Sequence, residues 1–70
     1  MKVQVKNNLV KEKKKLDGKL MGLNNFIRSV AFMNLTTRHR SLLESQATYM
    51  TKYSQVLRDR IIDITSQEKE

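Results

Sequence analysis

Small residues recur at helical spacing in the first half of the chain, at positions where a surface helix normally carries charge. They are Gly18, Gly22, Asn25 and Ser29, called here the glycine stripe. Each glycine inside a helix costs about 1 kcal/mol relative to alanine, and two of them one turn apart leave a patch without side chains. A flat ligand or the backbone of a partner can therefore approach this patch closely.

Cationic residues flank the glycine stripe, namely Lys15, Lys19 and Arg28. The chain carries 14 Lys and Arg against 7 Asp and Glu, which gives a formal net charge of +7. This charge on a small protein favours phosphate-bearing partners such as nucleotides, nucleic acid or anionic lipid. The alternative interpretation is a solvated lysine-rich face that maintains solubility.

Two tyrosines in the second half of the chain, Tyr49 and Tyr53, lie one turn apart with Lys52 between them. Tyrosine rings stack on nucleobases, and a neighbouring cation can bind a phosphate. Tyr53 fits a seam between helices, whereas Tyr49 lies at the edge of that seam and is free to meet a ligand or a partner chain. The candidate ligand-binding set is therefore Lys15, Gly18, Lys19, Gly22, Asn25, Arg28, Ser29 and Tyr49.

Residue types that support catalysis are scarce in this chain. The single histidine, His39, lies between Arg38 and Arg40, and cysteine is absent. A nucleophile needs a neighbouring base, and a structural zinc ion needs four ligands. Asp59 and Asp63 share a helix face, but two ligands do not make a metal site. We therefore expect a protein that is not an enzyme and has no catalytic residues, metal site or cofactor.

The chain contains no proline, and its apolar residues recur at helical spacing. A first helix is predicted over residues 8–31, capped by Asn7 or Asn8. Residues 1–7 are predicted to form an N-terminal arm. Lys13 occupies a seam position, where we expect the seam to fray. The apolar residues of this helix are Leu9, Leu16, Leu20, Leu23, Ile27 and Val30.

A second helix is predicted over residues 37–64, with Thr36 as its N-cap and residues 65–70 as a frayed tail. Residues 32–36 form the connection, in which Asn34 is expected to adopt the left-handed conformation that ends helices. The apolar residues Phe32, Met33 and Leu35 are expected to plug this end of the hairpin. The predicted fold is a single all-α domain, 1–70, an antiparallel two-helix hairpin.

The apolar band of the second helix is wider than a two-helix seam requires, because Leu42, Tyr49, Val56 and Ile61 lie beside the seam residues. Domains of this size rarely gain more than about 3–5 kcal/mol from their core, and no disulfide is available here. We therefore expect a homo-oligomeric helical bundle, with a tetramer or hexamer favoured. No apolar run is long enough to span a bilayer, and the N-terminus lacks a signal peptide, so a cytoplasmic location without a membrane partner is expected.

Three stretches of the chain carry a family resemblance: KKKLDGKL, NNFIRSVAFMNL and RSLLESQATYMTKYSQVLRDRI. From about Lys11 to Ile61 the chain resembles the small helical-hairpin proteins of crAss-like and other tailed phages. In architecture it is similar to phage anti-CBASS sponges, which assemble from short hairpins and trap cyclic oligonucleotide messengers of bacterial immunity without cleaving them. The resemblance implies a phage anti-defence protein in the host cytoplasm with a cyclic di- or trinucleotide ligand.

On this hypothesis Lys15, Lys19 and Arg28 neutralise phosphates, Asn25 and Ser29 contact base or ribose edges, and the Tyr49 ring stacks. Two other functions remain open. In the first, the hairpin inhibits or regulates a host protein through its apolar band; in the second, it binds nucleic acid nonspecifically through its lysine run. The chain has no recognition helix, zinc finger or aromatic stacking platform, so nucleic-acid binding is possible but not favoured.

Overall fold

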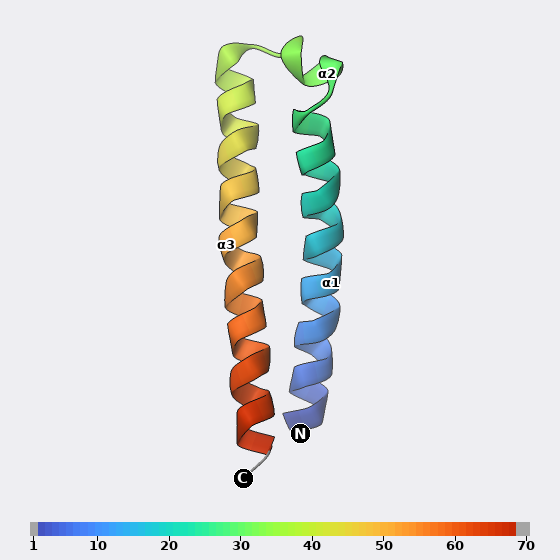
Figure 1. The fold of residues 1–70 in the computed structure, drawn as a ribbon, viewed down its shortest axis with the longest axis vertical. Helices are drawn as coiled ribbons and strands as arrows, with labels where there is room; N and C mark the ends of the chain where they lie inside the picture. Colours follow the sequence, from blue (N-terminus) through green and yellow to red (C-terminus); the bar gives the residue numbers. More distant parts are fainter. Residues whose placement is uncertain (1, 69–70) are drawn as a thin grey trace.

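The computed structural model of the protein describes residues 2–68, and side chains are described for residues 3–67. Three helices follow one another: α1 (Lys2–Ile27), α2 (Val30–Met33) and α3 (Thr37–Glu68). Figure 1 shows α1 and α3 side by side and antiparallel, with the short α2 at the turn. The hairpin measures 53 × 14 × 14 Å along its principal axes. The prediction of an all-helical hairpin is therefore confirmed for the described residues.

The first long helix ends earlier than the sequence predicted, at Ile27 rather than at residue 31. Ser29 is the N-cap of α2, with an extended backbone at φ −86° and ψ 162°. Its hydroxyl donates a hydrogen bond to the Phe26 carbonyl at 2.6 Å and accepts one from the Phe32 N–H at 3.3 Å. A short hydroxyl side chain that satisfies backbone groups in this way competes with helix continuation, which explains the break.

The turn into α3 follows the predicted N-cap but not the predicted conformation of Asn34. Thr36 Oγ1 accepts a hydrogen bond from the His39 N–H at 3.1 Å, and α3 begins at Thr37 as expected. Asn34 is the C-cap of α2, yet it is right-handed at φ −83° and ψ −7°, so the left-handed prediction is wrong. A four-residue helix ends here with a bond from the Asn34 N–H to the Ala31 carbonyl, and this bond needs no left-handed residue.

The core of the hairpin is a single seam between α1 and α3, closed at the turn by an aromatic pair. Leu57 is fully buried at 0% exposure, and Leu9 and Phe32 are also buried. The rings of Phe26 and Phe32 meet edge to face, with centroids 6.2 Å apart. Phe32 therefore plugs the turn as predicted, whereas Met33 is exposed because so short a helix turns only one side to the core.

The two long helices extend further toward the N- and C-termini of the chain than predicted. Residues 2–7 of the expected arm belong to α1, and residues 65–68 of the expected tail belong to α3. Neither segment contains proline or glycine, so nothing in the local sequence stops a helix that lies beside its neighbour. The half-buried Thr65 supports this ending through a bond from its hydroxyl to the Ile61 carbonyl at 2.8 Å. Residues 1, 69 and 70 lie outside the described residues.

Replacing Leu57 by alanine tests whether the seam holds the fold. The substitution Leu57→Ala is expected to cost about 2–5 kcal/mol, because it leaves a cavity at a fully buried position. A domain of this size gains only about 3–5 kcal/mol from its core, so the variant should lose most of its cooperative unfolding transition. Far-UV circular dichroism during thermal unfolding measures this loss.

The control is Ile62→Ala, which removes an exposed aliphatic side chain from the same helix. This change is expected to alter stability by no more than about 0.5 kcal/mol. Equal melting curves for Leu57→Ala and the wild-type protein would contradict the role of the seam.

Candidate functional site

The glycine stripe faces away from the rest of the hairpin. A Cβ atom added at Gly18 or at Gly22 would meet no neighbouring atom within 4 Å. The flanking Lys15 and Lys19 and the stripe residue Asn25 are likewise exposed. The hairpin itself therefore does not use this bare patch for packing, and the patch is accessible to a partner or a ligand.

Ser29 does not continue the stripe, contrary to the sequence prediction. The helical periodicity that would place it there ends with α1 at Ile27. Its hydroxyl is engaged in capping α2, as described above. The spacing of Gly18, Gly22 and Asn25 within α1 is as predicted, while Ser29 has a structural role at the turn.

Tyr49 comes from α3 and is one of the most exposed apolar side chains, at 68%. The hydrogen bond between Ser54 and Asp17 shows which residues of the two helices are level with each other. Five residues toward the turn from these two positions are Tyr49 and Gly22, and both helices rise by about 1.5 Å per residue. The structure thus brings Tyr49 to the height of the glycine stripe, but on the other helix.

A shallow groove of about 380 Å³ runs along α1 toward the turn and contains two of the predicted site residues. Asn25 and Arg28 line it, together with Asn24, which sequence reasoning missed. An arginine fork binds phosphate oxygens with two parallel bonds, and side-chain amides pair with base edges. We call this surface the amide groove; it is lined by Asp17, Leu20, Met21, Asn24, Asn25 and Arg28.

Asp17, at one end of the amide groove, joins the two long helices. Ser54 Oγ of α3 donates to Asp17 Oδ1 at 2.5 Å, and Lys13 Nζ donates to Asp17 Oδ2 at 2.6 Å. The bonds from Lys13 and then from Ser54 lower the pKa of the Asp17 carboxyl below its ordinary value. The seam was predicted to fray at Lys13, and it does not, because the Asp17 carboxylate one turn away pairs with the Lys13 charge.

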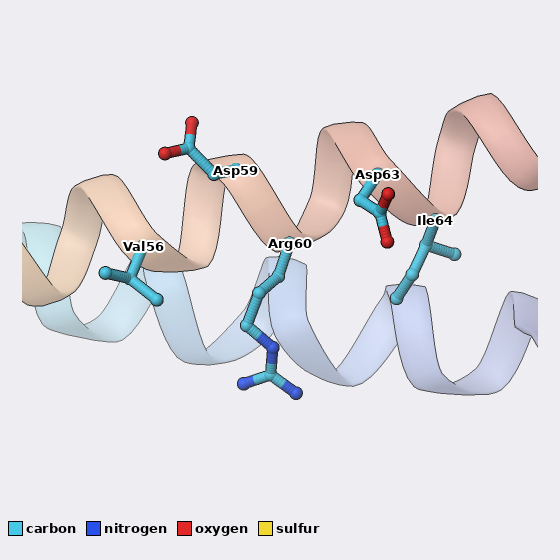
Figure 2. A pocket seen from close by; sticks show the side chains of 5 residues that line it. All are labelled: Val56, Asp59, Arg60, Asp63 and Ile64. Atoms are coloured by element: carbon cyan, nitrogen blue, oxygen red, sulfur yellow. The ribbon is translucent and has the colours of Figure 1, made fainter.

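A second groove of about 420 Å³ lies on α3 toward its C-terminal end, and we call it the α3 groove. Its lining residues are Val56, Asp59, Arg60, Asp63 and Ile64. Figure 2 shows Val56, Arg60 and Ile64 extending toward the α1 side of the helix, while Asp59 points away from α1. Asp59 accepts bonds from Arg58, and Asp63 accepts one from the Gln67 amide at 3.0 Å.

A family model, Sequestin, matches residues 4–63, which include α2, nearly all of α1 and most of α3. The chain belongs to the Sequestin family. The family name suggests a function in binding and sequestering a ligand, and this fits the resemblance to sponge proteins. Neither the curated proteins nor the solved structures gave a match.

The Sequestin match includes the predicted ligand-binding residues, the whole amide groove and all of the α3 groove except Ile64. Among the described residues of this Sequestin chain, no group of three or more His, Asp or Glu side chains is placed to hold a metal ion. None of its described helices is long and apolar enough to cross a membrane.

The lowered pKa of Asp17 predicts an acid-sensitive step in stability. A carboxyl with a depressed folded pKa contributes stability above its unfolded pKa, about 3.9, and this contribution is lost as the pH falls through the folded value. The wild-type melting temperature should therefore fall as the pH is lowered from about 5 to about 2. In Asp17→Asn this fall should be smaller, and the melting temperature at pH 7 should already be reduced.

Asp59→Asn is the matched control, because it removes one exposed carboxylate whose described bonds are to the neighbouring Arg58. Thermal unfolding followed by circular dichroism across the pH series gives the comparison. The acid-sensitive step does not come from Asp17 if Asp17→Asn loses as much stability on acidification as the wild-type protein does.

Proposed function

We propose that this protein is a homo-oligomeric sponge that binds cyclic oligonucleotide immune messengers and sequesters them without cleavage. In this role it is a phage anti-defence protein that acts in the host cytoplasm. The observation that carries the proposal is the amide groove, with Arg28 beside Asn24 and Asn25, in a chain of the Sequestin family.

The chemistry of this surface suits a cyclic nucleotide. Such a ligand presents phosphates and base edges close together, so it requires cations and amides on one surface. Arg28 supplies a guanidinium, and Asn24 and Asn25 supply donors and acceptors that can contact base or ribose edges. Lys15 and Lys19 are exposed on the same helix but do not line the amide groove, so they add positive charge near it and no contacts within it.

A second copy is needed to complete the site. Ligand pockets of about 300–1,000 Å³ usually bury most of the ligand surface, and the open amide groove, at about 380 Å³, supplies only one wall. The exposed Tyr49 ring is available to stack on a base held between copies, while the bare patch at Gly18 and Gly22 allows close approach. We therefore propose a tetramer or hexamer in which facing copies enclose the messenger.

Sequestration requires affinity and no chemical step, so we propose that the protein is not an enzyme. A hydrogen bond to a charged group contributes about 1.5–3 kcal/mol. Several such bonds from two chains approach the roughly −12 kcal/mol of a nanomolar complex, even after the cost of association.

Isothermal titration calorimetry with a panel of cyclic di- and trinucleotides tests the proposal. We expect tight, saturable binding by one or more of them, with chemically intact ligand recovered after denaturation of the protein. Arg28→Ala should weaken binding by about 10- to 100-fold, which corresponds to one lost charge-assisted bond. Arg58→Ala is the control, because Arg58 is an exposed arginine of α3 outside both grooves.

No heat from any member of the panel, together with strongly salt-dependent binding to DNA, would replace this proposal with nonspecific nucleic-acid binding. If the protein binds neither a cyclic nucleotide nor DNA, a host protein becomes the candidate ligand.

The substitution Gly22→Leu tests the bare patch. Leucine favours the helix by nearly 1 kcal/mol over glycine, and the hairpin has room for its side chain. The helix content should therefore be kept, while ligand affinity or assembly is lost because the bare patch is filled. Calorimetry and sedimentation analysis measure the two losses separately.

Thr48→Leu is the control for Gly22→Leu, since it adds an exposed leucine to α3 outside both grooves. Wild-type mass and wild-type affinity in Gly22→Leu would show that the glycine stripe is ordinary solvent-facing surface.

A further inference from the structure

An exposed apolar row runs along α3 beside the seam with α1. Leu42, Tyr49, Tyr53 and Val56 are between 44% and 68% exposed. Their spacing of seven, four and three residues places them on one side of the helix, as in a coiled-coil seam. We call this row the outer stripe. An exposed row of large apolar side chains is costly in water, and its regular spacing fits another helix.

The outer stripe carries opposite charges at its two ends. Arg38 lies one turn before Leu42, and Asp63 lies two turns after Val56, so both continue the same face. Arg38 is exposed, and no carboxylate of the described residues lies within ion-pair distance of it. Asp63 lines the α3 groove, and its described partner is the neutral amide of Gln67. The groove also contains the Asp59 carboxylate and the Arg60 guanidinium, so two carboxylates there outnumber one cation.

From this arrangement we infer that the outer stripe docks against the outer stripe of a second copy, with the two α3 helices antiparallel. Arg38 of each copy then enters the α3 groove of the other and pairs with Asp63. The inference rests on the homo-oligomer of the proposed function and specifies the face through which two copies meet.

The positions of the charges and of the tyrosines agree on one register. The point midway between Arg38 and Asp63 falls at about residue 50, and the point midway between Tyr49 and Tyr53 falls at residue 51. An antiparallel pair centred here therefore places both ion pairs at the ends and Tyr49 against Tyr53 of the second copy at the centre. In this arrangement the Tyr49 ring packs against protein instead of stacking on a base, so base recognition falls to the amide groove. A parallel pair would instead bring Arg38 against Arg38 and Asp63 against Asp63.

This symmetry identifies a second copy as the occupant. A two-fold interface uses the same patch twice, so the patch must be complementary to itself when reversed. The outer stripe meets this condition at its aromatic centre and at Arg38 and Asp63, whereas Leu42 and Val56 then lie opposite Arg60 and Gln46 of the second copy. Antiparallel packing also sets the N-terminal end of each α3 dipole beside the C-terminal end of the other.

Charge reversal tests the interface by sedimentation equilibrium. We expect Arg38→Glu and Asp63→Lys each to weaken self-association by about tenfold or more, since every dimer then contains two like-charge contacts. An equimolar mixture of the two variants should associate about as tightly as the wild-type protein, because each reversed charge then faces its opposite. The double variant Arg38→Glu/Asp63→Lys should recover in the same way.

The reversals are chosen so that unfolding cannot imitate the result. Each places a charge at the end of α3 that the helix dipole favours, acidic near the start and basic near the end. Circular dichroism should therefore show unchanged helix content. Arg58→Glu, on the same helix but outside the outer stripe, is the control and should leave self-association unchanged.

Wild-type association in both single variants, or no recovery in the mixture, would overturn the proposed interface. Calorimetry with cyclic nucleotides separates this result from the proposed function. If the wild-type protein binds a cyclic nucleotide while charge reversal leaves its assembly intact, the sponge uses another face. If the charge reversals behave as expected and no cyclic nucleotide binds, the interface stands and the proposed ligand is wrong.

Discussion

The hydrogen bond between Ser54 and Asp17 fixes how far α1 and α3 are shifted along each other, and the position of each surface group depends on that shift. A seam of leucines alone tolerates sliding by whole turns, because one apolar side chain resembles another. A carboxylate that accepts bonds from Lys13 and from the buried Ser54 has no such freedom. This polar contact in an apolar seam therefore specifies one arrangement of the hairpin.

The same register has a consequence for both candidate surfaces. It places Tyr49 at the height of Gly22, and it places the α3 groove beside the N-terminal part of α1 (Figure 2). Asp17 itself lines the amide groove, so the residue that aligns the helices also bounds the proposed ligand surface. A change at Asp17 would act on the fold and on the groove together, which is why Arg28 gives the cleaner test of ligand binding.

The periodic leucines allowed the two long helices and their antiparallel pairing to be predicted, and Thr36 marked the start of α3 correctly. The break at Ile27 was not predictable from spacing, because Ser29 fits the helical period of Gly18, Gly22 and Asn25 as well as it fits a cap. Ser54 as the partner of Asp17 was also missed, since the two residues are distant in sequence. Of the predicted site residues, Asn25 and Arg28 line the amide groove. Asn24 and Met21 could be recognised as lining residues only from the folded structure.

Charge gives the proposed assembly its main physical difficulty, because each chain carries a formal charge of +7. Copies with this charge repel one another, and the repulsion is strongest where the lysines meet. Ion pairs at the ends of the outer stripe offset part of the repulsion, and the phosphates of a bound messenger would offset more. Ligand binding and assembly are then thermodynamically linked: a messenger held between copies tightens the oligomer, and the oligomer raises affinity for the messenger by the same factor. On the proposed function, a sponge of this kind would assemble most tightly when its messenger is abundant.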